Sequence, residues 1–175
     1  THLTGDWDEA RRIREEQLKL DLEPNYRFAH LAVLAGYHTE LADLKGAQAR
    51  LDETRKLMQE HPRNDWHAAL YRWSESRVFV LRGKLVDAEK AAREAAEAVQ
   101  RFIAERGARS DPQLLYLRNL VETTHAYTLR RLARFADAEW VLRDTLARST
   151  RETGADSVQT ARVLLDLADN VLRQG

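Results

Sequence analysis

The chain of 175 residues contains no cysteine, three prolines and seven glycines. The absence of cysteine excludes disulfides and thiolate metal sites, and the scarcity of proline and glycine leaves few helix breakers. No apolar run approaches the ~18 residues that a membrane span needs, and the sequence shows no signal-peptide pattern. We therefore expect a cytoplasmic protein that does not bind membranes.

The chain also lacks an excess of charge of either sign, because 28 basic residues balance 28 acidic ones. Proteins that bind nucleic acid through its phosphates usually carry a basic surplus, so we expect no nucleic-acid partner. Charged residues make up 32% of the chain and hydrophobic residues 43%, mostly as the helix formers Leu, Ala, Arg and Glu. The first residue is Thr1 rather than methionine, so we expect a single domain over residues 1–175, excised from a longer chain.

A short motif recurs along the sequence: a small residue, any residue, a large apolar residue, two further residues and alanine. Its four copies are 5–10, 42–47, 83–88 and 133–138, and Gly175 stands where a fifth begins. Seven residues before a leading residue stands another small one, at Ala35, Ser76, Ala126 and Ala168. A small leader lets one helix end sharply, and the other small residues let two helices approach closely. The motif therefore predicts corners between paired helices rather than single long helices.

Apolar stripes at helical spacing flank the corners, and the prolines fall between the stripes. Together these features predict eight helices, at residues 6–20, 26–43, 46–60, 65–82, 86–106, 112–132, 136–152 and 157–173. Candidate N-caps are Asn64 or Asp65, Ser110 or Asp111, and Asp156 or Ser157. The first helix is then the second member of a pair and the last helix the first member of another. We expect apolar faces at both ends of this stack, covered by flanking repeats or by self-association.

This motif resembles that of the tetratricopeptide repeat. The 42-residue spacing from Ala133 to Gly175, and the stretch RETGADSVQTARVLLDLADNVLRQG, are similar to the longer repeats of kinesin light chains and bacterial signalling proteins. The resemblance implies an all-α fold, a right-handed superhelical stack of antiparallel helix pairs forming an α-solenoid. Glu75 and His125 depart from the family pattern, which usually has an apolar residue there. They indicate either a distorted superhelix or a misplaced register in the middle pairs.

In this family the first helix of each pair lines a concave groove. The resemblance places arginine and aromatic side chains on that inner wall, and we take these as candidate partner-binding residues: Trp73, Arg77, Tyr127, Arg130, Arg131 and Arg162. The same projection puts Leu165 and Leu172 on the wall. Arginine and aromatic residues anchor protein interfaces, and arginine pairs well with carboxylates. The segment LRRLARF lacks nearby acidic residues, so we expect an acidic or mixed protein or peptide partner. The alternative is that Trp73 belongs to the core and that the arginines are ordinary solvated charges.

Catalytic and metal signatures are missing from the sequence. It contains no HExxH motif and no glycine-rich phosphate loop. His38 and Glu40 are two residues apart and would face away from each other on a helix. His125 is better explained as a hydrogen-bonded interior histidine than as a ligand. We therefore expect no enzyme, no cofactor and no metal site.

The leading functional hypothesis is a non-catalytic protein-interaction scaffold that binds a peptide or a neighbouring domain in its groove. One alternative is a sensor of peptides or small ligands, or a regulatory segment of a larger bacterial signalling protein such as a kinase or protease-like effector. Another is a spacer or oligomerisation segment. Repeat motifs of this kind specify a fold better than a function.

Overall fold

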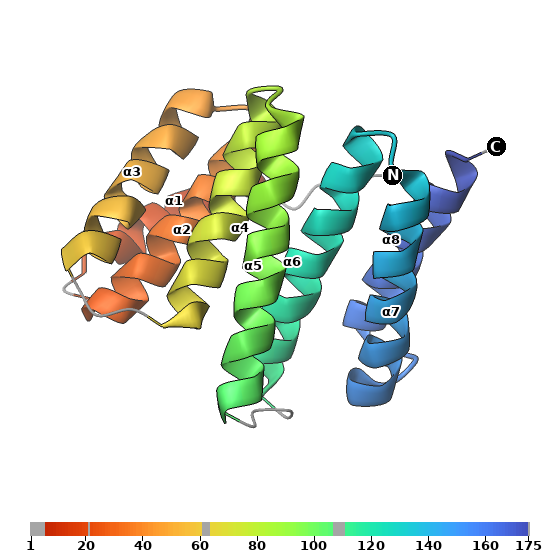
Figure 1. Ribbon diagram of the computed structural model, residues 1–175. Coiled ribbons are helices and arrows are strands. Elements are labelled where there is room, and N and C mark those ends of the chain that lie inside the picture. Colours follow the sequence, from red (N-terminus) through yellow and green to blue (C-terminus); the bar gives the residue numbers. More distant parts are fainter. Residues whose placement is uncertain (1–5, 21, 61–63, 107–110, 175) are drawn as a thin grey trace.

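The computed structural model describes residues 6–20, 22–60, 64–106 and 111–174, which form eight α-helices and no strand (Figure 1). The helices are α1 (Trp7–Leu18), α2 (Pro24–Glu40), α3 (Leu44–Glu60), α4 (Asp65–Leu81), α5 (Leu85–Arg106), α6 (Pro112–Arg131), α7 (Phe135–Thr153) and α8 (Val158–Leu172). The all-α prediction is confirmed, and the predicted helix ends lie within three residues of these bounds. Helix α2 begins earlier than predicted because Pro24 is its first residue, a position that proline favours.

The corners lie where the motif predicts them. At their leading positions, Ala42, Gly83 and Ala133 adopt left-handed backbone angles, with φ of 55°, 72° and 58°. The large apolar residue two positions later then starts the next helix, at Leu44, Leu85 or Phe135. The register of the middle pairs is therefore as predicted, while Gly5 and Gly175 lie outside the described residues.

Of the three predicted pairs of N-cap candidates, the structure uses Asn64, Asp111 and Ser157. Each accepts a hydrogen bond from a backbone N–H in the first turn of its helix. These bonds satisfy donors that have no partner within the helix.

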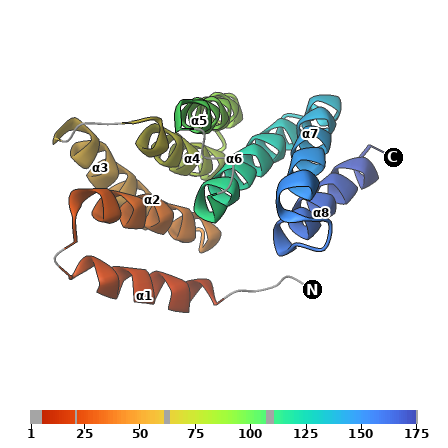
Figure 2. The ribbon, with the colours of Figure 1, turned by 90° about the horizontal axis from the view of Figure 1, so that it is seen from below.

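The helices form two curved rows, which Figure 2 shows from below. Helices α2, α4, α6 and α8 follow the inner side of the arc, and α3, α5 and α7 follow its outer side. Inner helices α4 and α6 each pack against the outer helices that precede and follow them, whereas α2 packs against α3 and α8 against α7. Helix α1 packs on α2, through the Trp7 and Tyr37 rings at 5.5 Å, and contains no buried residue.

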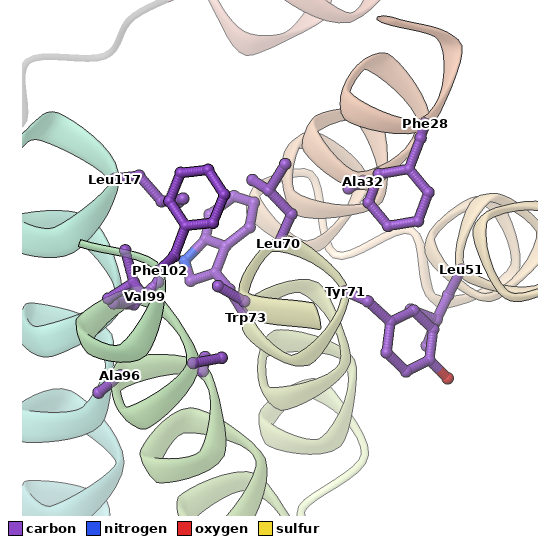
Figure 3. Packing of buried hydrophobic residues seen from close by; sticks show 14 of the residues in the cluster. Phe28, Ala32, Leu51, Leu70, Tyr71, Trp73, Ala96, Val99, Phe102 and Leu117 are labelled. Carbon is purple, nitrogen blue, oxygen red and sulfur yellow. The ribbon is translucent and has the colours of Figure 1, made fainter. Parts of the chain in front are cut away.

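The larger part of the core lies between α2 and α6. On the side of α4 that faces α5 and α6, Trp73 packs among Val99, Phe102 and Leu117, whereas Tyr71 lies toward α3 (Figure 3). The alanines of α5 let α4 and α5 pack closely, since Ala88, Ala92 and Ala95 are almost inaccessible. This cluster fixes the inner row of helices from α2 to α6.

A second, smaller core joins α6, α7 and α8 through Ala126, Leu129, Ala138, Leu142 and Val163. Polar groups lie beside it along the α6–α7 contact. Glu122 accepts hydrogen bonds from Thr145 and Arg148, Asn119 donates to Ser149, and Arg118 pairs with Glu152. The C-terminal helices are thus attached to the larger core partly through buried polar pairs.

The two departures from the family pattern are explained by specific polar contacts. Glu75 is buried and accepts hydrogen bonds from Tyr71 (3.0 Å) and Arg72 (2.5 Å). The Nε2 of His125 lies 3.1 Å from Glu89 Oε1, as expected for a hydrogen-bonded interior histidine. Neither residue shifts the register of the repeat.

Candidate protein-binding surface

The six candidate residues fall into two groups on the inner row of helices. Trp73 and Arg77 lie on α4, near the middle of the molecule. Tyr127, Arg130 and Arg131 lie near the C-terminal end of α6, and Arg162 lies on α8. The two groups differ in their accessibility to solvent.

The α4 group is internal structure. Trp73 is only 4% exposed, and its indole Nε1 donates a hydrogen bond to Thr124 Oγ1 at 3.1 Å. Arg77 lies over the Trp73 ring at 5.4 Å, donates from Nε to Thr39 Oγ1 at 3.0 Å, and pairs with Glu40. These contacts join α2, α4 and α6. The Trp73 ring thus belongs to the core, as the alternative interpretation has it, and offers a partner no accessible face.

Arg130 is also engaged within the molecule. Its side chain is only 9% exposed. Nη1 donates to the carbonyl oxygen of Asp166 and to Asp169 Oδ2, both at 2.9 Å, and Nη2 donates to Asp166 Oδ1 at 3.3 Å. The prediction that LRRLARF lacks compensating charge was therefore wrong for this arginine, because α8 supplies the carboxylates. Arg130 joins α6 to α8.

The pKa values of the two carboxylates around Arg130 shift in opposite directions. Burial raises the pKa of Asp166 above its ordinary value, against the attraction of Arg130. Hydrogen bonding by Arg173, helped by the charge of Arg130, lowers the pKa of Asp169. Asp169 thus keeps its negative charge at neutral pH and neutralises the arginines beside it.

Tyr127 and Arg131 form the accessible part of the α6 group. Tyr127 is 39% exposed, and Arg131 is exposed and donates from Nη1 to the Tyr127 hydroxyl at 3.0 Å. The guanidinium groups of Arg130 and Arg131 each lie 5.9 Å from the centre of the Tyr127 ring. Among the described residues, Arg131 has no carboxylate within 4.0 Å. Its guanidinium is therefore accessible to solvent.

Exposed apolar side chains also lie on α8, the helix that Arg130 joins to α6. Leu165 and Leu172 flank Asp169 on one face of the helix and are 69% and 80% exposed. Arg162, also exposed, lies on the same helix. The sequence had placed both leucines on the inner wall of the groove. They were not among the predicted binding residues because only arginine and aromatic side chains were taken as candidates. We use the term α6–α8 surface for Tyr127, Arg131, Arg162, Leu165 and Leu172.

The described residues hold no cluster of three or more His, Asp or Glu side chains arranged to bind a metal ion. Among the described helices, none is both long and apolar enough to span a bilayer. The expectations of a protein partner and of no nucleic-acid partner stay predictions.

No protein-family model matches the sequence, and no curated protein does. A solved structure, BtubC (BKLC) from P. vanneervenii, resembles the chain with a TM-score of 0.66 at 16% identity. The similarity covers 97% of this chain and 64% of that one, so this chain spans less than two thirds of its structural neighbour. BtubC is a kinesin light chain-like protein of the tetratricopeptide type. At this identity the likeness concerns the fold alone, and it agrees with the all-α stack of helices in the described residues.

Proposed function

We propose that the chain is a non-catalytic protein-interaction scaffold, and that its α6–α8 surface binds a peptide or domain segment carrying acidic and apolar side chains. The observation that carries this proposal is the exposed Arg131 guanidinium, held by the Tyr127 hydroxyl and without an acidic partner among the described residues. Helical-repeat folds commonly present such extended binding surfaces.

The chemistry of the surface defines the partner. Arg131 and Arg162 would pair with carboxylates, in the case of Arg131 beside an aromatic ring that partly excludes water. Leu165 and Leu172 offer apolar area for a leucine or phenylalanine of the partner. A segment that alternates acidic and large apolar residues fits both requirements.

The test is a selection from a random peptide library, followed by affinity measurements with the selected peptides. We expect enrichment of Asp and Glu together with large apolar residues. The substitution Arg131→Glu should weaken binding by about tenfold to a hundredfold, since it removes a charge-assisted hydrogen bond and adds repulsion. Arg130 is unsuitable for this test because its substitution would release α8 from α6.

The matched control is Arg143→Glu on α7, in the outer row, where the arginine is exposed and pairs with Glu139. It makes the same change of charge away from the surface, so binding should stay at the wild-type level. Selected peptides that bind the Arg131→Glu and Arg143→Glu variants equally well would contradict the proposal.

A further inference from the structure

The exposed leucines of the α6–α8 surface, Leu165 and Leu172, belong to a longer apolar stripe on helix α8. Its apolar residues follow a heptad pattern and are all exposed in the structure: Val158, Ala161, Leu165, Ala168 and Leu172. Leu164 and Val171 lie along one edge of this stripe and are also exposed. The buried residues of α8, such as Val163 and Asn170, lie on the opposite side of the helix. Alternating spacings of three and four residues are typical of a helix that packs along another helix.

A further helix continuing the stack would cover only part of the stripe. The residues of α6 that stand 42 positions before Leu164, Ala168 and Val171 are Glu122, Ala126 and Leu129, and all three are buried. They contact α7.

Leu165, in contrast, corresponds to Thr123, which stays partly exposed in the stack. Leu172 corresponds to Arg130, which α8 rather than α7 covers. Val158 corresponds to Tyr116, which is exposed. At Val158 and Leu165 the apolar stripe of α8 therefore extends beyond the part that stacking covers.

The stripe is self-complementary when two copies of α8 run antiparallel. If Leu165 of one copy faces Ala168 of the other, the two-fold axis passes between these positions, and Ala161 then faces Leu172 of the other copy. A large residue thus meets a small one in each of these layers, which lets the two helices pack closely.

The flanking positions are complementary in the same register. In an antiparallel pair, positions that directly follow the small residues of the heptad face each other across the interface. These are Arg162 and Asp169 of the second copy, so opposite charges meet on one flank. On the other flank Leu164 faces Val171 of the second copy. In a parallel pair Leu164 would face Asp169, which places an apolar side chain against a charge.

We propose that two copies of this chain associate through antiparallel pairing of their α8 helices. The Asp169 carboxylate is half-exposed beside Arg130 and Arg173, so it remains accessible to Arg162 of the second copy. Helix α8 has 15 residues, about 22 Å at 1.5 Å per residue, and so presents only two heptads. An interface of this length forms a reversible dimer whose population rises with protein concentration. The inference does not rest on the proposed peptide binding, with which pairing would compete because both use Arg162, Leu165 and Leu172.

Sedimentation velocity over the micromolar to millimolar range tests the association. We expect the wild-type chain to shift from monomer to dimer, and Ala168→Glu to remain monomeric, because the substitution puts a carboxylate near its own symmetry mate. The matched control is Ala147→Glu, at an exposed alanine of α7, which should dimerise as the wild type does. A wild-type chain that stays monomeric at millimolar concentration overturns the proposal and leaves this face to another helix.

Disulfide trapping tests the direction of pairing. Because the chain has no native cysteine, a disulfide can form only between the introduced cysteines. A mixture of Ala161→Cys and Leu172→Cys proteins in a glutathione buffer should form a mixed disulfide dimer. Ala161→Cys alone should not, because its two copies would lie about 16 Å apart along the axis. Efficient cross-linking of Ala161→Cys with itself would overturn the antiparallel arrangement.

Discussion

At the scale of single residues, Gly36 of α2 makes room for the Trp73 ring of α4. A Cβ atom at this position would lie 2.7 Å from Cη2 of Trp73, so the indole ring of α4 packs directly against the backbone of α2. The same indole ring bonds Thr124 and lies under Arg77. One glycine therefore allows an aromatic side chain to join three helices.

We predict that Gly36→Ala destabilises the protein by about 1–3 kcal/mol, because the added methyl group forces the Trp73 ring or the α2 backbone to move. Alanine would otherwise favour a helix by about 1 kcal/mol over glycine. Urea unfolding measures the difference. In a Trp73→Phe background the smaller ring leaves room, so the same substitution should cost less. An equal cost in both backgrounds would show that the close contact is not the cause.

The candidate residues show what sequence reasoning can and cannot place at this scale. Helical spacing put Tyr127, Arg131 and Leu165 on the inner row, and all three are accessible there. Spacing within one helix does not reveal burial by a neighbouring helix, so Trp73 was selected although it is core. The carboxylates of Arg130 follow it by 36 and 39 residues, and no local pattern connects them.

At the scale of helices, the corners carry backbone strain at alanine. Ala42 and Ala133 have φ near +55°, a region that costs a residue with a Cβ about 1–2 kcal/mol, whereas Gly83 occupies it freely. The corner hydrogen bonds are alike, since Gly83 N–H donates to Val80 and Ala133 N–H to Arg130, at 3.0 and 2.9 Å. The three corners thus share one backbone conformation, but the leading residue is alanine in two of them and glycine in the third.

We predict that Ala133→Gly stabilises the protein by about 0.5–1 kcal/mol, the strain relieved less the extra entropy of the unfolded glycine. The reciprocal change Gly83→Ala should destabilise it by a similar amount, since a Cβ at Gly83 meets no atom within 4 Å and only the backbone is affected. Thermal unfolding of both variants gives the two differences. A destabilising Ala133→Gly would contradict the assignment of strain to this corner.

The helix bounds were predictable because caps and corners are local signals. Asn64, Asp111 and Ser157 are short polar residues directly before apolar stripes, and each caps its helix. The start of α2 was missed because its N-cap, Glu23, makes no side-chain hydrogen bond and gives no such signal.

At the scale of the whole molecule, the core is not continuous. The cluster from α2 to α6 and the smaller cluster of α6 to α8 are distinct, and buried polar pairs line the α6–α7 contact. The repeat motif predicted the order of the helices but not this division. Its small and apolar positions recur in each unit, while Glu122, Arg148 and Asn119 stand at positions that the motif leaves unspecified.

This division predicts that α7 and α8 open together at lower free energy than α4 and α5, because a helical-repeat stack gains stability from each local interface separately. Native-state hydrogen exchange measures both openings in one sample. The variant Glu122→Ala removes the acceptor of Thr145 and Arg148 and should lower the protection of α7 and α8 by about 1–3 kcal/mol. The amides of α4 and α5 should keep their wild-type protection, since none of these polar contacts reaches them. A uniform loss of protection in all four helices would instead mean that the stack unfolds as one cooperative unit.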